Sequence, residues 1–206
     1  MPANVPADPP TSLRPSAGDT RGNILAAAID ILHERGAGAL TVRSVATAAG
    51  CSTTGVYTWF GGKNGLVEAI FIDGFRRFGD ALLAARAAAQ PDRHLLALAE
   101  AYRVWAIANP THYMVMFGGA VPDFAPSAEA LTLARGTFET LVDAAGSARR
   151  EHDLVGEPED IAHHLWAGMH GYVSLELARM DMAHDEDERT ARFQRGLHRM
   201  VRGLRR

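Results

Sequence analysis

The chain has 206 residues, enough for one domain with a sizeable apolar core or for two small domains. Hydrophobic residues make up 47% and charged residues 22%, which excludes a disordered chain, and the net charge of -3 excludes a strongly basic nucleic-acid-binding protein as a description of the whole. No apolar run is long enough to span a bilayer, and the start of the sequence does not resemble a secretory signal. The single cysteine, Cys51, excludes an intrachain disulfide. We therefore expect a cytoplasmic protein with no membrane partner.

The first predicted elements are an arm and a helix. Residues 1–18 hold half of the ten prolines and show no apolar periodicity, which predicts a disordered arm. Apolar residues then recur at helical spacing from Ile24 to Leu32, and we expect Asp19 or Thr20 to cap the start of this helix.

Two short helices joined by a tight turn are predicted next. Thr41 can cap a helix over 42–48, Gly50 can make the turn, and Ser52 can cap a helix over 53–59. This is a helix-turn-helix layout, although short connections of this kind also occur in helical bundles that bind no DNA.

The second short helix carries small polar residues that suit a DNA groove. Hydroxyls at a helix N-terminus can reach base edges, while a phenolic hydroxyl or an ammonium can reach phosphates. Residues 40–67 contain no acid, so this window is neutral to positive. The expected DNA contacts are Thr41, Arg43, Ser52, Thr53, Thr54, Gly55, Tyr57, Trp59 and Lys63.

The rest of the chain is predicted to be helical as well. A long helix runs from Lys63 into the 80s, and apolar stripes follow at 95–106, 131–142, 161–180 and 193–204. No window alternates with period two for long enough to suggest a sheet, so the predicted fold class is all-α.

The helix-turn-helix region resembles the DNA-binding domain of the TetR family of bacterial transcriptional regulators. The matching residues include Arg21, Ile24 to Ala27, Gly36, Leu40 to Arg43, Val45, Ala46, Ala49, Gly50, Ser52, Gly55 to Tyr57, Phe60, Lys63 and Leu66. The resemblance implies a three-helix DNA-binding unit over residues 19–64. Position 59 is often His in the family, and here Trp59 replaces the imidazole by an indole that can donate only one hydrogen bond.

A second resemblance, to the family subgroup with a so-called WHG C-terminal domain, covers the later helices. It is carried by Ala101, Tyr102, Trp105, Ala106, Asn109, Pro110, Tyr113, Met116, Phe117, Trp166, Met169 to Gly171 and Leu175 to Leu177. The resemblance implies that residues 65–206 form a helical bundle for ligand binding and dimerisation.

Large, pliable side chains in this part suggest an apolar ligand pocket. The expected pocket residues are Trp105, Tyr113, Met114, Phe117, Trp166 and His170. The same side chains could instead fill an ordinary core.

Histidines and small residues share the predicted helix that follows Pro158. Asp160, His163 and His170 could share a face as metal ligands, although hydrogen-bonded or exposed histidines are the preferred interpretation, and we expect no metal and no cofactor. Small residues on another stripe permit close helix packing, either between subunits or within one. The expected dimer contacts are Gly168, Gly171, Leu175, Phe193, Leu197, Met200, Val201 and Leu204.

Together these features predict a ligand-responsive, homodimeric DNA-binding regulator. The favoured form is a repressor that a small apolar or aromatic effector releases from a near-palindromic operator. One alternative is an all-α small-molecule or metal-binding protein without a DNA function. Another is a helical enzyme that pairs His170 with an acid such as Glu176, although no catalytic motif stands out.

Overall fold

The computed structural model describes residues 17–205 and confirms the all-α prediction, since that part of the chain holds helices and no strand beyond one isolated bridge, Leu154 to Arg205. The helices are α1 (Ala17–Arg35), α2 (Val42–Ala48), α3 (Thr53–Phe60), α4 (Lys63–Ala88), α5 (His94–Ala108), α6 (Pro110–Phe117), α7 (Ala128–His152), α8 (Pro158–Leu177) and α9 (Glu186–Gly203).

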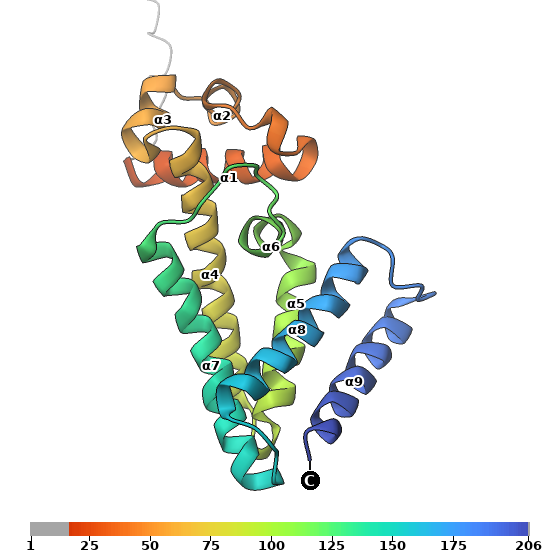
Figure 1. Cartoon of the computed structure of the whole chain (residues 1–206). Coiled ribbons are helices and arrows are strands. Elements are labelled where there is room, and N and C mark those ends of the chain that lie inside the picture. The colour runs from red at the N-terminus through yellow and green to blue at the C-terminus, as the bar shows by residue number, and fades with distance from the viewer. Residues whose placement is uncertain (1–16, 206) are drawn as a thin grey trace, which may run out of the picture.

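The N-terminal unit consists of α1, α2 and α3 gathered at one end of the molecule (Figure 1). Helix α1 begins at Ala17, so neither Asp19 nor Thr20 is its cap, and residues 17 and 18 of the expected arm belong to this helix. The rest of the predicted arm, residues 1–16, lies outside the described part of the chain. A single 3-10 turn at Ala37–Ala39, which the sequence pattern did not predict, follows α1.

The caps predicted for the two short helices are present. The Thr41 hydroxyl accepts from Ser44 N at 3.0 Å and the Ser44 hydroxyl accepts from Thr41 N at 3.0 Å, which is a reciprocal capping box. The Ser52 hydroxyl accepts from Gly55 N at 3.1 Å at the start of α3. Gly50, between the helices, has φ 64°, a conformation that glycine adopts without the cost of a Cβ. Local sequence therefore dictates this geometry.

Helix α4 is the long element that leaves the N-terminal unit and runs through the rest of the molecule (Figure 1). It packs against α5, α6 and α7, while α8 crosses α5 and α7, and α9 packs on α8. Among the described residues, no helix is long and apolar enough to cross a membrane.

Helix α6 was missed by the sequence pattern. Asn109 and Pro110 end α5 as predicted, but Pro110 is also the first residue of α6, a position where its missing N–H costs nothing. Two other boundaries need correction: α8 ends at Leu177, which leaves Met180 outside it and 63% exposed, and Leu204 is the C-cap of α9.

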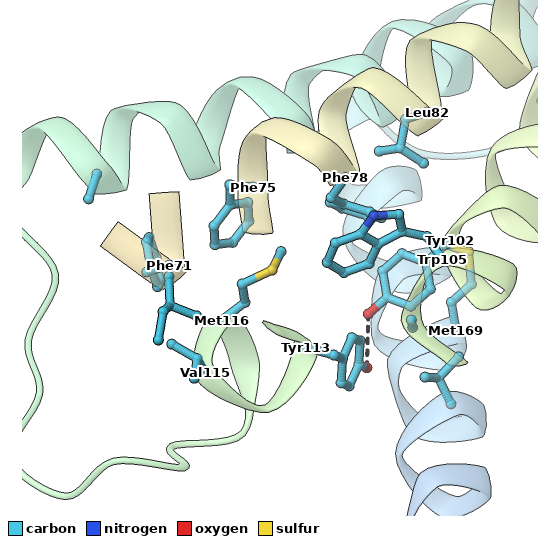
Figure 2. Close-up of a cluster of buried hydrophobic side chains, with 14 of the residues drawn as sticks. Phe71, Phe75, Phe78, Leu82, Tyr102, Trp105, Tyr113, Val115, Met116 and Met169 are labelled. Atoms are coloured by element: carbon cyan, nitrogen blue, oxygen red, sulfur yellow. Dashed lines mark hydrogen bonds between the residues drawn. The ribbon is translucent and has the colours of Figure 1, made fainter. Parts of the chain in front are cut away.

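The core of the larger part is an aromatic cluster between α4, α5 and α6 (Figure 2). Phe78 packs against Trp105 and Tyr102 with ring centroids 5.1 and 5.4 Å apart. Helix α6 approaches α4 at Gly74, where an added Cβ would lie 2.6 Å from the Met116 sulfur. The glycine therefore sets the spacing between these two helices.

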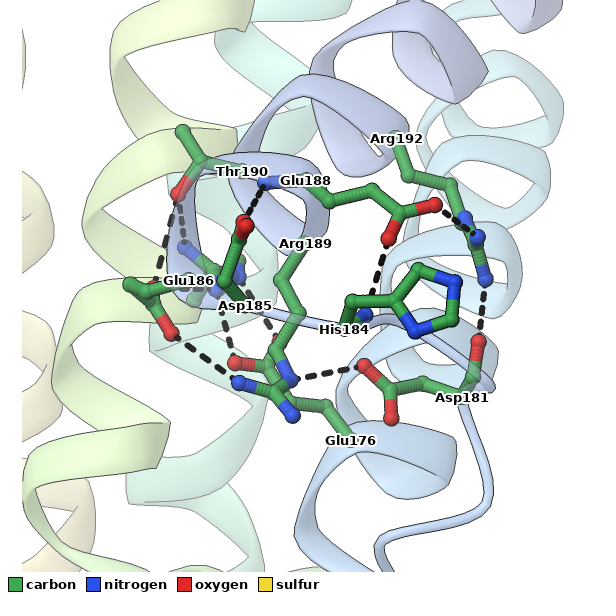
Figure 3. Close-up of polar contacts among 10 residues, drawn as sticks. Glu176, Asp181, His184, Asp185, Glu186, Glu188, Arg189, Thr190 and Arg192 are labelled. Carbon is green, nitrogen blue, oxygen red and sulfur yellow. Dashed lines mark hydrogen bonds and ion pairs between the residues drawn. The ribbon is translucent and has the colours of Figure 1, made fainter.

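Helix α9 is held to the bundle by buried charge. The Arg103 guanidinium, 7% exposed on α5, donates two hydrogen bonds to the Glu176 carboxylate of α8, at 2.8 and 2.7 Å, and a third to Glu186 of α9 at 2.6 Å. Figure 3 shows neighbouring contacts, in which Arg189 of α9 pairs with the Asp181 carboxylate and Arg192 donates to the Asp181 backbone carbonyl, in the connection from α8. These pairs fix the position of α9 relative to α5 and α8.

Candidate nucleic-acid interface and internal cavity

The two short helices share an apolar base with α1 and α4. Val45, Ala46, Val56 and Phe60 are all less than one-tenth exposed. Arg21 of α1 lies over the Phe60 ring at 5.1 Å. With this base buried, the polar side of α3 faces solvent.

Most of the expected DNA contacts lie on that open surface. Arg43, Thr53 and Thr54 are exposed, and Tyr57 is 58% exposed. Arg43 has no ion pair among the described residues, so its charge is available to an anion. Thr41 and Ser52 are exposed but already serve as helix caps, while Gly55 is half-buried.

Lys63 has a structural contact that the sequence did not reveal. Its Nζ donates to the Ala37 carbonyl at 3.3 Å and thereby ties the start of α4 to the turn that follows α1. An ammonium carries three donors, so two remain for a phosphate.

Trp59 lies on a different side of α3 from Tyr57, because residues two positions apart in a helix are rotated by about 200° about its axis. It is 41% exposed and lines a shallow groove between α1 and α4 with Arg21, Glu68 and Arg76. The Tyr57 ring instead packs over Gly62, 3.3 Å from the position of an added Cβ. The two aromatic residues therefore do not form one surface.

An apolar cavity of about 330 Å³ lies deeper in the larger part of the molecule, which is within the size range of small-molecule sites. Helices α4 to α8 all contribute to its wall. The lining residues are Phe75, Phe78, Leu82, Leu98, Tyr102, Phe117, Leu131, Ala134, Arg135, Thr137, Phe138, Leu141, His163, Trp166 and Met169.

The structure brings only two of the expected pocket residues, Phe117 and Trp166, to the cavity wall. Trp105 packs behind Phe78, and Met114 points outward on α6 with 42% of its surface exposed. The contribution of α4 was not predicted, although Phe75, Phe78 and Leu82 follow helical spacing and could have been recognised as one stripe.

Tyr113 and His170, the other two expected pocket residues, form a buried polar triad with Tyr102. Nδ1 of His170 lies 2.7 Å from the Tyr113 hydroxyl and 3.2 Å from the Tyr102 hydroxyl, and the hydroxyls lie 3.0 Å apart (Figure 2 shows the last contact). Burial lowers the pKa of His170 and raises the pKa of both tyrosines. With Nδ1 unprotonated, the Tyr113 hydroxyl can donate to His170 and the Tyr102 hydroxyl can donate to the Tyr113 oxygen.

Two histidines of α8 contact neighbouring side chains, His170 by hydrogen bonds to tyrosines and His163 by ring packing. Glu176 is bound to Arg103 and His170 to two tyrosines, so the described residues do not show His170 paired with Glu176. His163 contacts the Phe138 and Trp166 rings, and no group of three or more His, Cys, Asp or Glu side chains in residues 17–205 converges to hold a metal ion.

The expected dimer contacts separate into buried and open sets. Phe193 and Leu197 are 3% and 4% exposed inside the protomer, and Gly168 packs against Met200 of α9. These residues pack α8 against α9 within one chain, which is the internal packing that the sequence left open beside an intersubunit role. Val201 and Leu204 are half-buried against the same core. Leu175 is 48% exposed, and Gly171 has open space beside it.

Two family models match the chain. The one described as "Bacterial regulatory proteins, tetR family" matches residues 24–70, which span most of α1 and all of α2 and α3. The one described as "Tetracyclin repressor-like, C-terminal domain" matches residues 95–200, from α5 into α9.

Individual proteins and structures agree with these matches. The HTH-type transcriptional regulator Rv1816 of Mycobacterium tuberculosis is 26% identical over 193 residues, covering 77% of this chain and 82% of the relative. The crystal structure of a regulatory protein, SCO4313, superposes with a TM-score of 0.76 at 27% identity over 89% of this chain and 96% of that one. A Rhodococcus sp. RHA1 protein of unknown function has the same TM-score at 26% identity, over 95% and 98%.

Proposed function

We propose that this chain, which belongs to the TetR family of bacterial regulatory proteins, acts as a repressor. It is a DNA-binding transcriptional regulator, and in this proposal a small molecule releases it from its operator. The effector enters the cavity between α4 and α8. Its body is apolar or aromatic, because rings and aliphatic side chains make most of the wall.

The proposed DNA contacts divide by chemistry. Thr53, Thr54 and Tyr57 on α3 approach the major groove, while Arg43 and Lys63 neutralise phosphates. The open, acid-free surface of α2 and α3 supports this division. Thr41 and Ser52 act mainly by fixing the helix ends, which is a change from their expected role as direct contacts.

The observation that carries the proposed switch is the position of α6. Within eight residues, α6 contacts the DNA-binding unit, the long helix and the cavity. Thr111 is hydrogen-bonded to His33 of α1 at 3.1 Å, His112 to Asp73 of α4 at 3.1 Å, and Phe117 lines the cavity. A ligand that displaces Phe117 therefore pushes on an element that is bonded to both α1 and α4.

The consequence for DNA depends on dimerisation. We propose a homodimer through the open faces of α8 and α9, with a domain boundary near residue 64 at the start of α4. Two recognition helices must match half-sites about 34–36 Å apart, so a shift of a few ångströms in α4 prevents simultaneous engagement.

A salt-dependent gel shift with DNA from upstream of the chain's own gene tests this function. A regulator retains that fragment more strongly than a scrambled duplex of equal length, and the affinity falls steeply with added salt. An all-α small-molecule-binding protein whose helix-turn-helix is incidental would show no difference between the two duplexes.

A further inference from the structure

The side chains that line the cavity include a positive charge and no negative charge. Of the lining residues, none is Asp or Glu, while Arg135 of α7 and His163 of α8 bring a cation and a hydrogen-bonding imidazole to facing helices. The remaining polar groups are the Trp166 indole N–H, the buried Tyr102, whose hydroxyl belongs to the internal triad, and Thr137, whose hydroxyl donates to Ala134 O at 2.7 Å.

Arg135 is an exposed arginine whose guanidinium is unpaired within the described residues. It forms no ion pair and no side-chain hydrogen bond with the described residues, although Glu139 follows it by one helical turn. This contrasts with Arg103, whose guanidinium is saturated by Glu176, Glu186 and Thr190. The Arg135 guanidinium is therefore free to bind an anion.

His163 stands at the aromatic side of the same wall. Its ring packs edge-on against Trp166 at 5.5 Å and Phe138 at 5.8 Å, and its nitrogens have no partner among the described residues. A donor placed against two aromatic rings marks a position where a polar group of a ligand adjoins its apolar body.

We propose that the cavity binds an amphipathic monoanion, a carboxylate on an aromatic or medium-length aliphatic body, with the carboxylate between Arg135 and His163. The planar guanidinium fork matches a carboxylate in two-point geometry, and the body packs among Phe78, Phe117 and Trp166. An ammonium ligand meets the positive charge of Arg135 and no compensating acid in the wall. The inference rests on the proposed function only in taking this cavity as the effector site.

Calorimetric titration of the full chain with three isosteres that differ in charge tests the inference: naphthoate, naphthylmethanol and naphthylmethylammonium, with decanoate, decanol and decylammonium as an aliphatic series. The expected order of affinity is carboxylate, then alcohol, then ammonium. Arg135→Gln weakens carboxylate binding by about 10-fold or more and leaves alcohol binding within about two-fold, because only the charged hydrogen bonds are lost.

The matched control is Arg199→Gln, an exposed arginine of α9 outside the cavity, which changes neither affinity. Thermal melts of both variants verify that they fold. The inference is overturned if alcohols bind as tightly as carboxylates, if Arg135→Gln leaves carboxylate binding unchanged, or if no probe binds at millimolar concentration.

A gel shift on the same preparations separates this inference from the proposed function. If the protein retains upstream DNA but binds no carboxylate, the anion site is rejected and the proposed function stands. If the protein binds carboxylates but retains no DNA, the proposed function is rejected and the anion site stands.

Discussion

His112 of α6 donates from Nε2 to the Asp73 carboxylate of α4 across 3.1 Å, although the histidine is only 5% exposed. This hydrogen bond is the main reason that the pKa of Asp73 lies below its ordinary value of 3.8, and the nearby Arg77 lowers it further. The contact lies between the cavity and the DNA-binding helices, so it links the two ends of the proposed switch.

The Asp73 contact predicts a pH-dependent stability. Since the folded pKa is lowered, the ionised carboxylate stabilises the protein above pH of about 3.8, and the stabilisation is lost as the pH falls through that value and the lower folded pKa. Urea unfolding should show Asp73→Asn less stable than wild type by about 1–2 kcal/mol at neutral pH, with the gap closing in acid. A gap that is constant across pH would contradict this assignment.

Lys63 predicts a change in the salt dependence of DNA binding. Lys63→Ala removes one phosphate contact, so it should weaken binding to all sequences and reduce the salt slope by about one unit. Lys63→Arg keeps the charge and should retain the slope. If Lys63→Ala altered the sequence preference while leaving the slope unchanged, Lys63 would not be a phosphate contact. Thermal melts would also report the loss of its bond to Ala37.

Leu175 and Leu197 predict opposite outcomes for the same substitution. Leu175 is 48% exposed on α8, so Leu175→Glu should give a folded monomer that has lost specific DNA binding. Leu197 is 4% exposed inside the protomer, so Leu197→Glu should unfold the chain instead. Sedimentation velocity and circular dichroism distinguish the two. A Leu175→Glu protein that remained dimeric would place the interface elsewhere.

The buried pair of Arg103 and Glu176 predicts a large loss of stability. Their side chains are 8% and 10% exposed, so Glu176→Ala leaves the guanidinium mainly to Glu186, a more exposed partner. The expected cost is about 3–5 kcal/mol in urea unfolding. Glu139→Ala, an exposed acid of α7, serves as the control and should change stability by less than about 0.5 kcal/mol. Equal effects of the two variants would refute the role of the buried pair.

The helix-turn-helix was predictable because its signals are local. A capping residue three positions before its backbone partner and a glycine at the turn determine α2 and α3 with little help from the rest of the chain. Helix α6 was not predictable in this way, since its eight residues are too few to show a periodic stripe.

The cavity was predicted in kind but not in composition. Which aromatic side chains face it depends on how closely α6 approaches α4 at Gly74, a distance that no local pattern encodes. The same reason explains Phe193 and Leu197: an apolar stripe shows that a helix face is buried, but not whether its partner is the same chain or another.

The proposed switch requires that the cavity and the DNA-binding surface be thermodynamically coupled. The measurement that addresses this coupling is the calorimetric affinity of a carboxylate probe from the naphthoate or decanoate series, with and without saturating upstream duplex. A probe that lowers DNA affinity 100-fold requires about 2.7 kcal/mol of coupling, so the duplex must lower probe affinity by the same factor. Equal probe affinity in the two titrations would contradict the switch, even if the probe occupied the cavity.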